Sequence, residues 1–152
     1  YTLETGLWLE WEAAGGGKFN GVAATSINGV TYIQDATNGR IYTLSPTVYR
    51  DSGVDFTMTL QTDRQNMGSP NRKWEHGLAL IGDTTTGMVK VSVSDNDYSG
   101  FGTPRSLDMS LKKKQIGRIG PAFYERAHKF TFTDNYPLRV QAYLPDITAW
   151  DK

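Results

Sequence analysis

The sequence contains no cysteine and no excess of charge of either sign. Without cysteine, disulfide bonds, thiolate chemistry and zinc sites with cysteine ligands are excluded. The 16 basic residues balance the 16 acidic residues, so the chain as a whole gives no electrostatic reason to bind nucleic acid or an anionic membrane. No apolar run approaches the roughly 18 residues that a spanning helix needs, and we predict no membrane span.

The N-terminal residues lack the features of a signal peptide. The opening Tyr1-Thr2-Leu3-Glu4 has neither a basic region nor an apolar stretch, and it lacks an initiator methionine. We therefore expect the 152 residues to be a fragment of a longer chain. A length of about 100–150 residues is common for one domain, and we predict a single β domain over residues 1–152.

Apolar residues with helical spacing are also scarce, and residues 121–127 are the best helix candidate. The chain contains 16 glycines, and β-rich runs alternate with turn-forming clusters. This pattern is typical of an all-β fold, and we predict an antiparallel β-sandwich of short strands. The expected strands cover residues 7–12, 56–62, 78–81, 90–94, 105–111, 129–133 and 139–144.

The clearest local signal is a β-hairpin over residues 30–44. β-rich runs at residues 29–33 and 40–44 flank the sequence Asp35-Ala36-Thr37-Asn38-Gly39. Asn-Gly supplies the positive-φ positions that tight hairpin turns require. We predict that the chain reverses at Asn38-Gly39.

Residues with catalytic chemistry are few and scattered. The two histidines, His76 and His128, lie far apart, and no serine stands in a Gly-x-Ser-x-Gly elbow. Gly15-Gly16-Gly17-Lys18 lacks the spacing of a phosphate-binding loop. Carboxylate pairs of the kind that glycosidases use could come from four residues, but most chains of this size offer such pairs. We predict that the chain is not an enzyme and binds no cofactor. The four carboxylates are Glu10, Glu12, Asp35 and Asp51.

Residues 95–100 match the opening of a calcium-binding loop. Asp95, Asn96 and Asp97 begin the segment, and Gly100 stands at its sixth position. The twelfth position, where such loops place a bidentate glutamate, is Ser106. A tight polar turn between strands therefore fits better than a calcium site, and we predict no metal.

Basic and aromatic residues cluster once, beyond residue 110. A basic strand with interleaved aromatics can follow a nucleic-acid backbone, whereas a charged strand end also serves solubility alone. Phe123 and Tyr124 supply the aromatics. The candidates for DNA-facing residues are Lys112, Lys113, Lys114 and Arg118.

Tryptophan is frequent, at positions 8, 11, 74 and 150. Aromatic rings dominate β-sandwich cores and subunit interfaces, and this is the expected role of Trp8, Trp11, Trp74 and Trp150. A subset on one exposed concave face would instead form a platform for sugars.

Two segments carry a resemblance to a known family. Residues 35–53 read D-A-T-N-G-R-I-Y-T-L-S-P-T-V-Y-R-D-S-G. They resemble a D-x-x-x-G-x-(I/L)-Y-x-L signature, closed by aromatic, Asp and Gly, in the C-terminal part of tail-nozzle proteins of short-tailed phages. This family is also called packaged-DNA stabilisation or head-completion protein. Residues 91–97 and the following Gln115-Ile116-Gly117-Arg118-Ile119-Gly120 resemble its second segment. The residues that then match its aromatic and basic strand are Phe123, Tyr124, Arg126 and Phe130.

The sequence also departs from this family. Val93 stands where the family has tryptophan or arginine, and residues 95–100 replace an acidic, glycine-rich turn. Residues 134–139 replace the usual closing glycine with its basic residues. Hairpins with a similar signature also occur in propeller repeats.

The resemblance implies a structural role in the virion, below the portal. Such proteins form rings, generally hexameric, which help to close the filled head and pass DNA outward. Their copies meet through sheet edges and loops, and portal and other tail proteins are neighbours. A carbohydrate-binding module of a tail fibre or secreted hydrolase is the alternative from another class. A glycan-cleaving enzyme is a third, and it needs two facing carboxyl groups about 5–10 Å apart.

Overall fold

The structure, a computed structural model, describes residues 6, 12–14 and 16–150. It divides the chain into two compact units, Tyr1–Phe56 (unit 1) and Thr57–Lys152 (unit 2). The sequence predicts one domain over residues 1–152. The boundary between the two units falls inside a β-rich run, and no flexible linker marks it.

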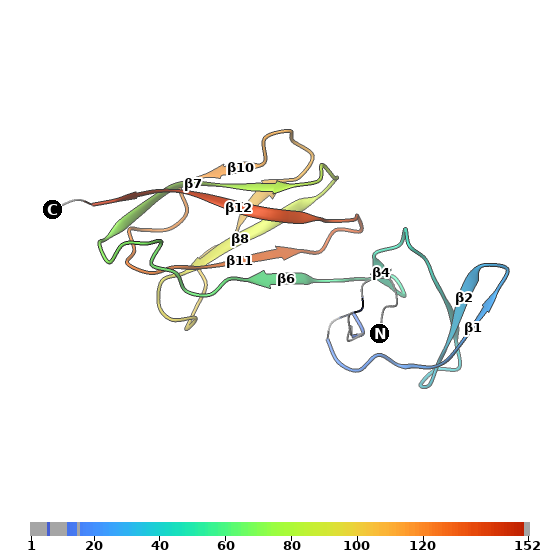
Figure 1. Ribbon diagram of the computed structural model, residues 1–152. Helices are drawn as coiled ribbons and strands as arrows, with labels where there is room; N and C mark the ends of the chain where they lie inside the picture. The colour runs from blue at the N-terminus through green and yellow to red at the C-terminus, as the bar shows by residue number, and fades with distance from the viewer. Residues whose placement is uncertain (1–5, 7–11, 15, 151–152) are drawn as a thin grey trace. The chain divides into compact units, whose positions relative to one another are not determined.

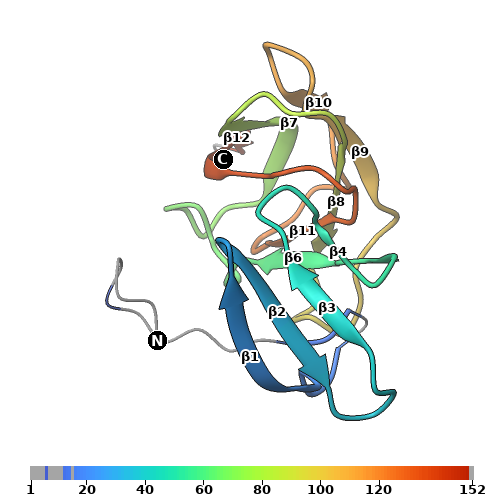
Figure 2. The ribbon, with the colours of Figure 1, turned by 90° about the vertical axis from the view of Figure 1, so that its right-hand side faces the viewer.

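Unit 1 contains a three-stranded antiparallel meander, β1–β2–β3, which faces the viewer in Figure 2. A two-stranded ribbon of β4 and β5 follows. The strands are β1 (Gly21–Ile27), β2 (Val30–Asp35), β3 (Ile41–Leu44), β4 (Arg50–Asp51) and β5 (Val54–Asp55).

The predicted hairpin over residues 30–44 is confirmed, since β2 pairs with β3 in antiparallel register. Its turn is built on Asp35, whose Oδ1 accepts hydrogen bonds from the Thr37 amide at 2.6 Å and the Asn38 amide at 3.3 Å. Gly39 adopts a φ of 68°, a conformation that glycine reaches without strain. Aspartate and glycine thus place the reversal where the sequence predicts it.

Unit 1 buries little. Among its described residues, Ile33 is the only apolar side chain with less than a tenth of its surface exposed. Gly21 helps to bury it, because a Cβ at this position would lie 2.7 Å from Ile33 Cγ2 and 2.4 Å from the Phe19 ring. Phe19 can therefore pack across β1 toward Ile33.

Unit 2 is a sandwich of two antiparallel sheets, with strand orders β6–β11–β8–β9 and β10–β7–β12 (Figure 1). The first sheet contains β6 (Met58–Gln61), β8 (Met88–Ser94), β9 (Arg105–Asp108) and β11 (Ala127–Phe132). The second contains β7 (Lys73–Gly82), β10 (Gln115–Gly117) and β12 (Val140–Ala149).

The core of unit 2 lies between these sheets. Alternate residues of each strand point inward, as the pleat requires, so Leu78 and Leu80 of β7 meet Val89 and Val91 of β8. Leu107, Met109, Ile119, Phe130 and Phe132 complete this core. Unit 2 thus has the packed interior that unit 1 lacks.

The prediction of an all-β fold is confirmed for the described residues, which contain no helix. The helix candidate at residues 121–127 is wrong. The Phe123 backbone forms a β-bridge with Lys73, with N···O distances of 2.7 and 3.0 Å, and long-range pairing of this kind overrides a weak local preference. Six of the seven expected strands overlap observed ones. The expected strand at residues 7–12 lies outside the described residues apart from Glu12, which bridges to Lys18.

Within the described residues, no helix is long and apolar enough to cross a membrane.

Candidate functional site

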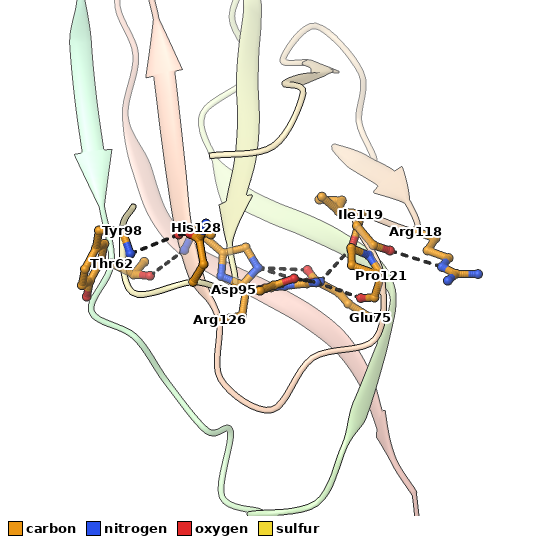
Figure 3. A network of polar contacts seen from close by, with 12 residues as sticks. Thr62, Glu75, Asp95, Tyr98, Arg118, Ile119, Pro121, Arg126 and His128 are labelled. Carbon is orange, nitrogen blue, oxygen red and sulfur yellow. Dashed lines mark hydrogen bonds and ion pairs between the residues drawn. The ribbon is translucent and has the colours of Figure 1, made fainter. Parts of the chain in front are cut away.

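A buried group of charged side chains lies at one end of the sandwich (Figure 3). At its centre is Arg126, whose side chain is completely buried. Its Nε and Nη2 donate to the two oxygens of Asp95, both at 2.7 Å, and its Nη1 donates to Glu75 Oε2 at 2.9 Å. It also donates to the carbonyls of Ile119 at 2.7 Å and Pro121 at 2.9 Å. The guanidinium therefore ties β7, the end of β8 and the segment after β10 to the start of β11.

His128 completes this buried cluster. Its Nε2 lies 3.1 Å from both oxygens of Glu75, so an Nε2–H donates to the carboxylate. Its Nδ1 is buried and has no hydrogen-bond partner. The ring packs against Phe130 and Tyr143, with centroids 6.3 and 5.4 Å away. Glu75 thus accepts from an arginine and a histidine with no access to solvent.

The charge of Arg126 in this cluster is paired with the carboxylates of Glu75 and Asp95. Burial alone would lower the pKa of Arg126, but the hydrogen bonds that it donates to Asp95 and Glu75, and the charges of these carboxylates, raise it. Burial likewise raises the pKa of the Tyr143 hydroxyl, which donates to Gln65. The side chains of Glu75, Arg126 and His128 are completely buried, whereas that of Asp95 is a quarter exposed. Glu75, Arg126 and His128 therefore join β7 to the start of β11 inside unit 2.

Lys73 is a second buried cation beside this cluster. Its Nζ donates to the carbonyls of Ser69 and Asn71, both at 2.6 Å. Burial lowers the pKa of Lys73, and the charge of Glu125 partly opposes this effect. The ammonium fixes the loop before β7, and Phe123 lies between Lys73 and Arg126, with centroid distances of 5.9 and 3.9 Å.

The segment at residues 95–100 forms a tight polar turn after β8. The Asp95 carboxylate is taken by Arg126, and Asn96 Oδ1 accepts from Ser94 Oγ at 2.8 Å and the Gly100 amide at 3.2 Å. Asp97 pairs with Arg64 at 3.2 Å. Within the described part of the chain, no group of three or more His, Asp or Glu side chains is placed to hold a metal ion.

The outer face of the β10–β7–β12 sheet carries an aromatic ladder. Trp74 and Trp150 lie with ring centroids 6.1 Å apart. The Arg118 guanidinium covers Trp74 at 4.0 Å and that of Arg72 lies 5.8 Å from Trp150. Trp150 keeps half of its surface exposed. These two tryptophans are therefore outside the sandwich core, whereas Trp8 and Trp11 lie outside the described residues.

Unit 1 contains a pocket of about 690 Å³ beside its meander. A volume of roughly 300–1,000 Å³ is usual for ligand-binding clefts. The aromatic residues Phe19, Tyr42, Tyr49 and Phe56 line it together with carboxylates. Three of the four carboxylates noted in the sequence come together here, namely Glu12, Asp35 and Asp51, and Glu10 lies outside the described residues.

Two of these carboxylates, Asp35 and Asp51, already have structural partners. Asp51 Oδ2 accepts from the Ala14 amide at 3.0 Å. Hydrogen bonds from Thr37 hold the pKa of Asp35 below its usual value, so Asp35 is ionised at neutral pH. An ionised carboxylate can act as a general base or nucleophile but not as a proton donor.

The four candidate DNA-facing residues do not form one surface. Lys112 and Lys113 are exposed at the β9–β10 loop. Lys114 is buried, with its Nζ on Thr84 Oγ1 at 3.1 Å, and therefore does not fit the prediction. Arg118 lies beyond the other end of β10, against Trp74. Of the two histidines, exposed His76 pairs with Thr148 at 3.2 Å, and His128 belongs to the buried cluster.

Sequence reasoning missed Lys73 and Glu75. They sit inward at odd positions of β7, whereas Leu78 and Leu80 point inward at even positions, because the register with β12 shifts between Asp146 and Ile147. The only signal of their burial in the sequence is that Lys73 and Glu75 are charged residues within a β-rich run.

No protein-family model matches this chain, and no curated protein does.

Proposed function

We propose that this chain is a structural module of a homo-oligomeric ring at the portal–tail junction of a short-tailed phage, where it helps to retain and pass packaged DNA. Its place would be the virion, its partners copies of itself, the portal and other tail proteins. It would act through surfaces and not through catalysis.

The observation that carries this proposal is where the two resembling segments lie in the structure. In unit 2, Asp95, Ile119, Gly120 and Arg126 meet in the buried cluster. Gly120 has a φ of 69°, and a Cβ on it would lie 2.9 Å from Arg126 Nη2. Only glycine fits this site without strain, so the spacing from Asp95 through Ile119-Gly120 to Arg126 has a structural cause. A spacing with a structural cause supports the proposal that this unit has the same fold as the C-terminal part of the tail-nozzle family.

The first resembling segment has a structural role as well. Asp35, Tyr42, Leu44, Tyr49 and Asp51 all line the unit 1 pocket. The segment therefore shapes a concave surface on a unit with few buried apolar residues. Exposed apolar surface on a folded protein usually marks a contact with another protein, as a ring subunit requires.

The test is the mass of the full-length protein, measured by native mass spectrometry, with electron microscopy of the particle. We expect a homo-oligomer and density at the portal–tail junction. A monomer absent from that junction would contradict the proposal, and hydrolysis of a bacterial polysaccharide would contradict its non-catalytic part.

The aromatic ladder favours one second candidate, a carbohydrate-binding module. Trp150 is half exposed beside Trp74, and an aromatic face of this kind can stack on a sugar ring. A glycan screen with the Trp150→Ala variant tests it. Binding that this variant abolishes would support the module, with His76→Ala as a control elsewhere on the same face.

A further inference from the structure

The neutral charge of the whole chain hides a separation between its two units. Unit 1 contains three Lys or Arg residues and six Asp or Glu residues, a net charge of −3. Unit 2 contains thirteen Lys or Arg residues and ten Asp or Glu residues, a net charge of +3. Charge asymmetry between two parts of a chain indicates that each part favours a partner of the opposite sign.

Three of the six acidic residues of unit 1 line its pocket. Glu12, Asp35 and Asp51 line it, and the single basic residue in its wall, Arg50, is paired with Asp55. The remaining wall is largely aromatic and aliphatic. Carboxylates beside aromatic rings suit a ligand that is cationic and partly apolar.

The basic unit carries a segment of this chemistry at the tip of its β9–β10 loop, which extends beyond the strands in Figures 1 and 2. Leu111 exposes half of its surface, and Lys112 and Lys113 are exposed beside it. Among the described residues, no hydrogen bond or ion pair joins these two lysines to another group.

This tip is held between two anchors. On one side Met109 is buried in the core, and Asp108 Oδ1 accepts from the Ser110 amide at 2.8 Å and its hydroxyl at 2.7 Å. On the other side Lys114 is buried, and its carbonyl accepts from the Leu80 amide at 2.9 Å. Little conformational freedom remains to be lost when the tip binds, which favours affinity.

We propose that Leu111, Lys112 and Lys113 of one copy dock in the unit 1 pocket of a neighbouring copy. Leu111 packs on the aromatic wall, and the two lysines face the pocket carboxylates. Because the two surfaces differ and one chain carries both, the contact runs head to tail, and such contacts close into a ring when the rotation between copies returns to its start. The inference rests on the homo-oligomer of the proposed function. The exposed leucine favours a protein partner over DNA, since a phosphate backbone offers it no apolar surface.

Disulfide trapping tests the contact directly, because the chain has no cysteine. The Leu111→Cys variant is mixed with a size-tagged Val54→Cys variant, whose substitution lies in the pocket wall, and mixed dimers are counted under oxidising conditions. The control pair is Lys90→Cys mixed with Val54→Cys. We expect the Leu111→Cys and Val54→Cys dimers to form at least about tenfold faster than the control dimers, because oppositely charged surfaces raise encounter rates by about 10–10³. Equal rates would overturn the contact, as would a monomeric internal disulfide in the Leu111→Cys/Val54→Cys double variant.

Charge reversal tests the role of the lysines. We expect Lys112→Glu/Lys113→Glu to abolish the rate advantage and Lys90→Glu/Arg139→Glu to keep it, since both doubles change the charge equally. High salt should remove the advantage as well. If Lys112→Glu/Lys113→Glu instead weakens binding to duplex DNA and leaves trapping unchanged, these lysines face DNA. A full-length ring without trapping refutes this contact alone, whereas a full-length monomer refutes the proposed function too.

Discussion

Unit 1 and unit 2 are built from the same kinds of strands but are stabilised differently. Unit 2 buries Val91, Leu107 and Met109 completely between two sheets. Unit 1 has one meander and, among its described residues, buries only Ile33 of its apolar side chains. Burial of apolar surface is the main stabilising contribution to a fold. Unit 2 therefore has the interior of an independent domain, whereas unit 1 needs surface from elsewhere to reach the same stability.

The difference extends to where each unit places its polar residues. Unit 2 buries the side chains of Arg126 and Glu75, which together with the partly exposed Asp95 join the ends of four segments. Unit 1 uses them around a pocket, in turns such as that of Asp35. Internal charges fix one arrangement of strands, whereas charges around a pocket remain able to meet a partner. This difference supports the proposal that unit 1 contacts a partner while unit 2 holds the fold.

Hydrogen exchange gives the largest expected contrast between the two units. In the chain without partners, amides of β8 and β11 should exchange only by global unfolding, at about 5–15 kcal/mol for a typical domain. Amides of β1 and β3 should exchange through local opening at a much smaller free energy. Mass-spectrometric exchange on peptides measures both. Equal protection in the two units would break the comparison.

Substitution at the buried cluster should come next in size. Arg126→Met leaves the carboxylates of Glu75 and Asp95 without their cation, and removing one partner of a buried ion pair costs about 3–5 kcal/mol. The free energy of unfolding of unit 2, followed by urea titration with tryptophan fluorescence, should fall by this amount. Arg139→Met is the matched control, because its pair with Asp83 is exposed and such pairs contribute about 0–1 kcal/mol. A loss of only about 0–1 kcal/mol from Arg126→Met would contradict a stabilising role for the cluster.

Two glycines with similar backbone conformations sharpen the contrast. Gly29 turns between β1 and β2 with a φ of 78° and open space around it, whereas Gly120 has a φ of 69° and is crowded by Arg126 and Val93. Gly29→Ala should cost only the conformational strain, about 1–2 kcal/mol. Gly120→Ala adds overpacking of about 1–3 kcal/mol, so it should lower the free energy of unfolding of unit 2 by more than Gly29→Ala lowers the opening free energy of the β1–β2 hairpin, measured by hydrogen exchange. The reverse order would contradict the crowding at Gly120.

The sequence predicted what depends on neighbouring residues. The reversal at Asn38-Gly39 and the polar turn after Ser94 follow from the side chains of a few successive residues, and both were located correctly. The inward position of Lys73 and Glu75 depends on a register shift between distant strands, which no local pattern reveals. The buried cluster could not be predicted from local patterns either, because Glu75, Asp95 and Arg126 meet only after three strands pair. Phe123 and Arg126 were visible as motif residues, but the bridges of Phe123 to Lys73 and of Arg126 to Gln65 were not.

The smallest predicted effect concerns two aspartates with similar environments, one in each unit. Hydrogen bonds from Ser110 lower the pKa of Asp108, and hydrogen bonds from Thr37 lower that of Asp35, in both cases from an ordinary value of 3.8. A carboxylate with a lowered folded-state pKa stabilises the fold above its unfolded pKa, and this contribution is lost as pH falls through the folded pKa. Asp108→Asn should therefore destabilise unit 2 slightly at pH 7, and the difference from the natural chain should shrink as pH falls below 3.8. Ser110→Ala removes one of the two hydrogen bonds and should reproduce part of the effect. Asp35→Asn should show the same pH dependence, but in the exchange of hairpin amides and not in global unfolding, because unit 1 opens locally. Carboxyl NMR titration measures both pKa values, and a pKa at or above 3.8 for either residue would contradict the turn geometry assigned to it.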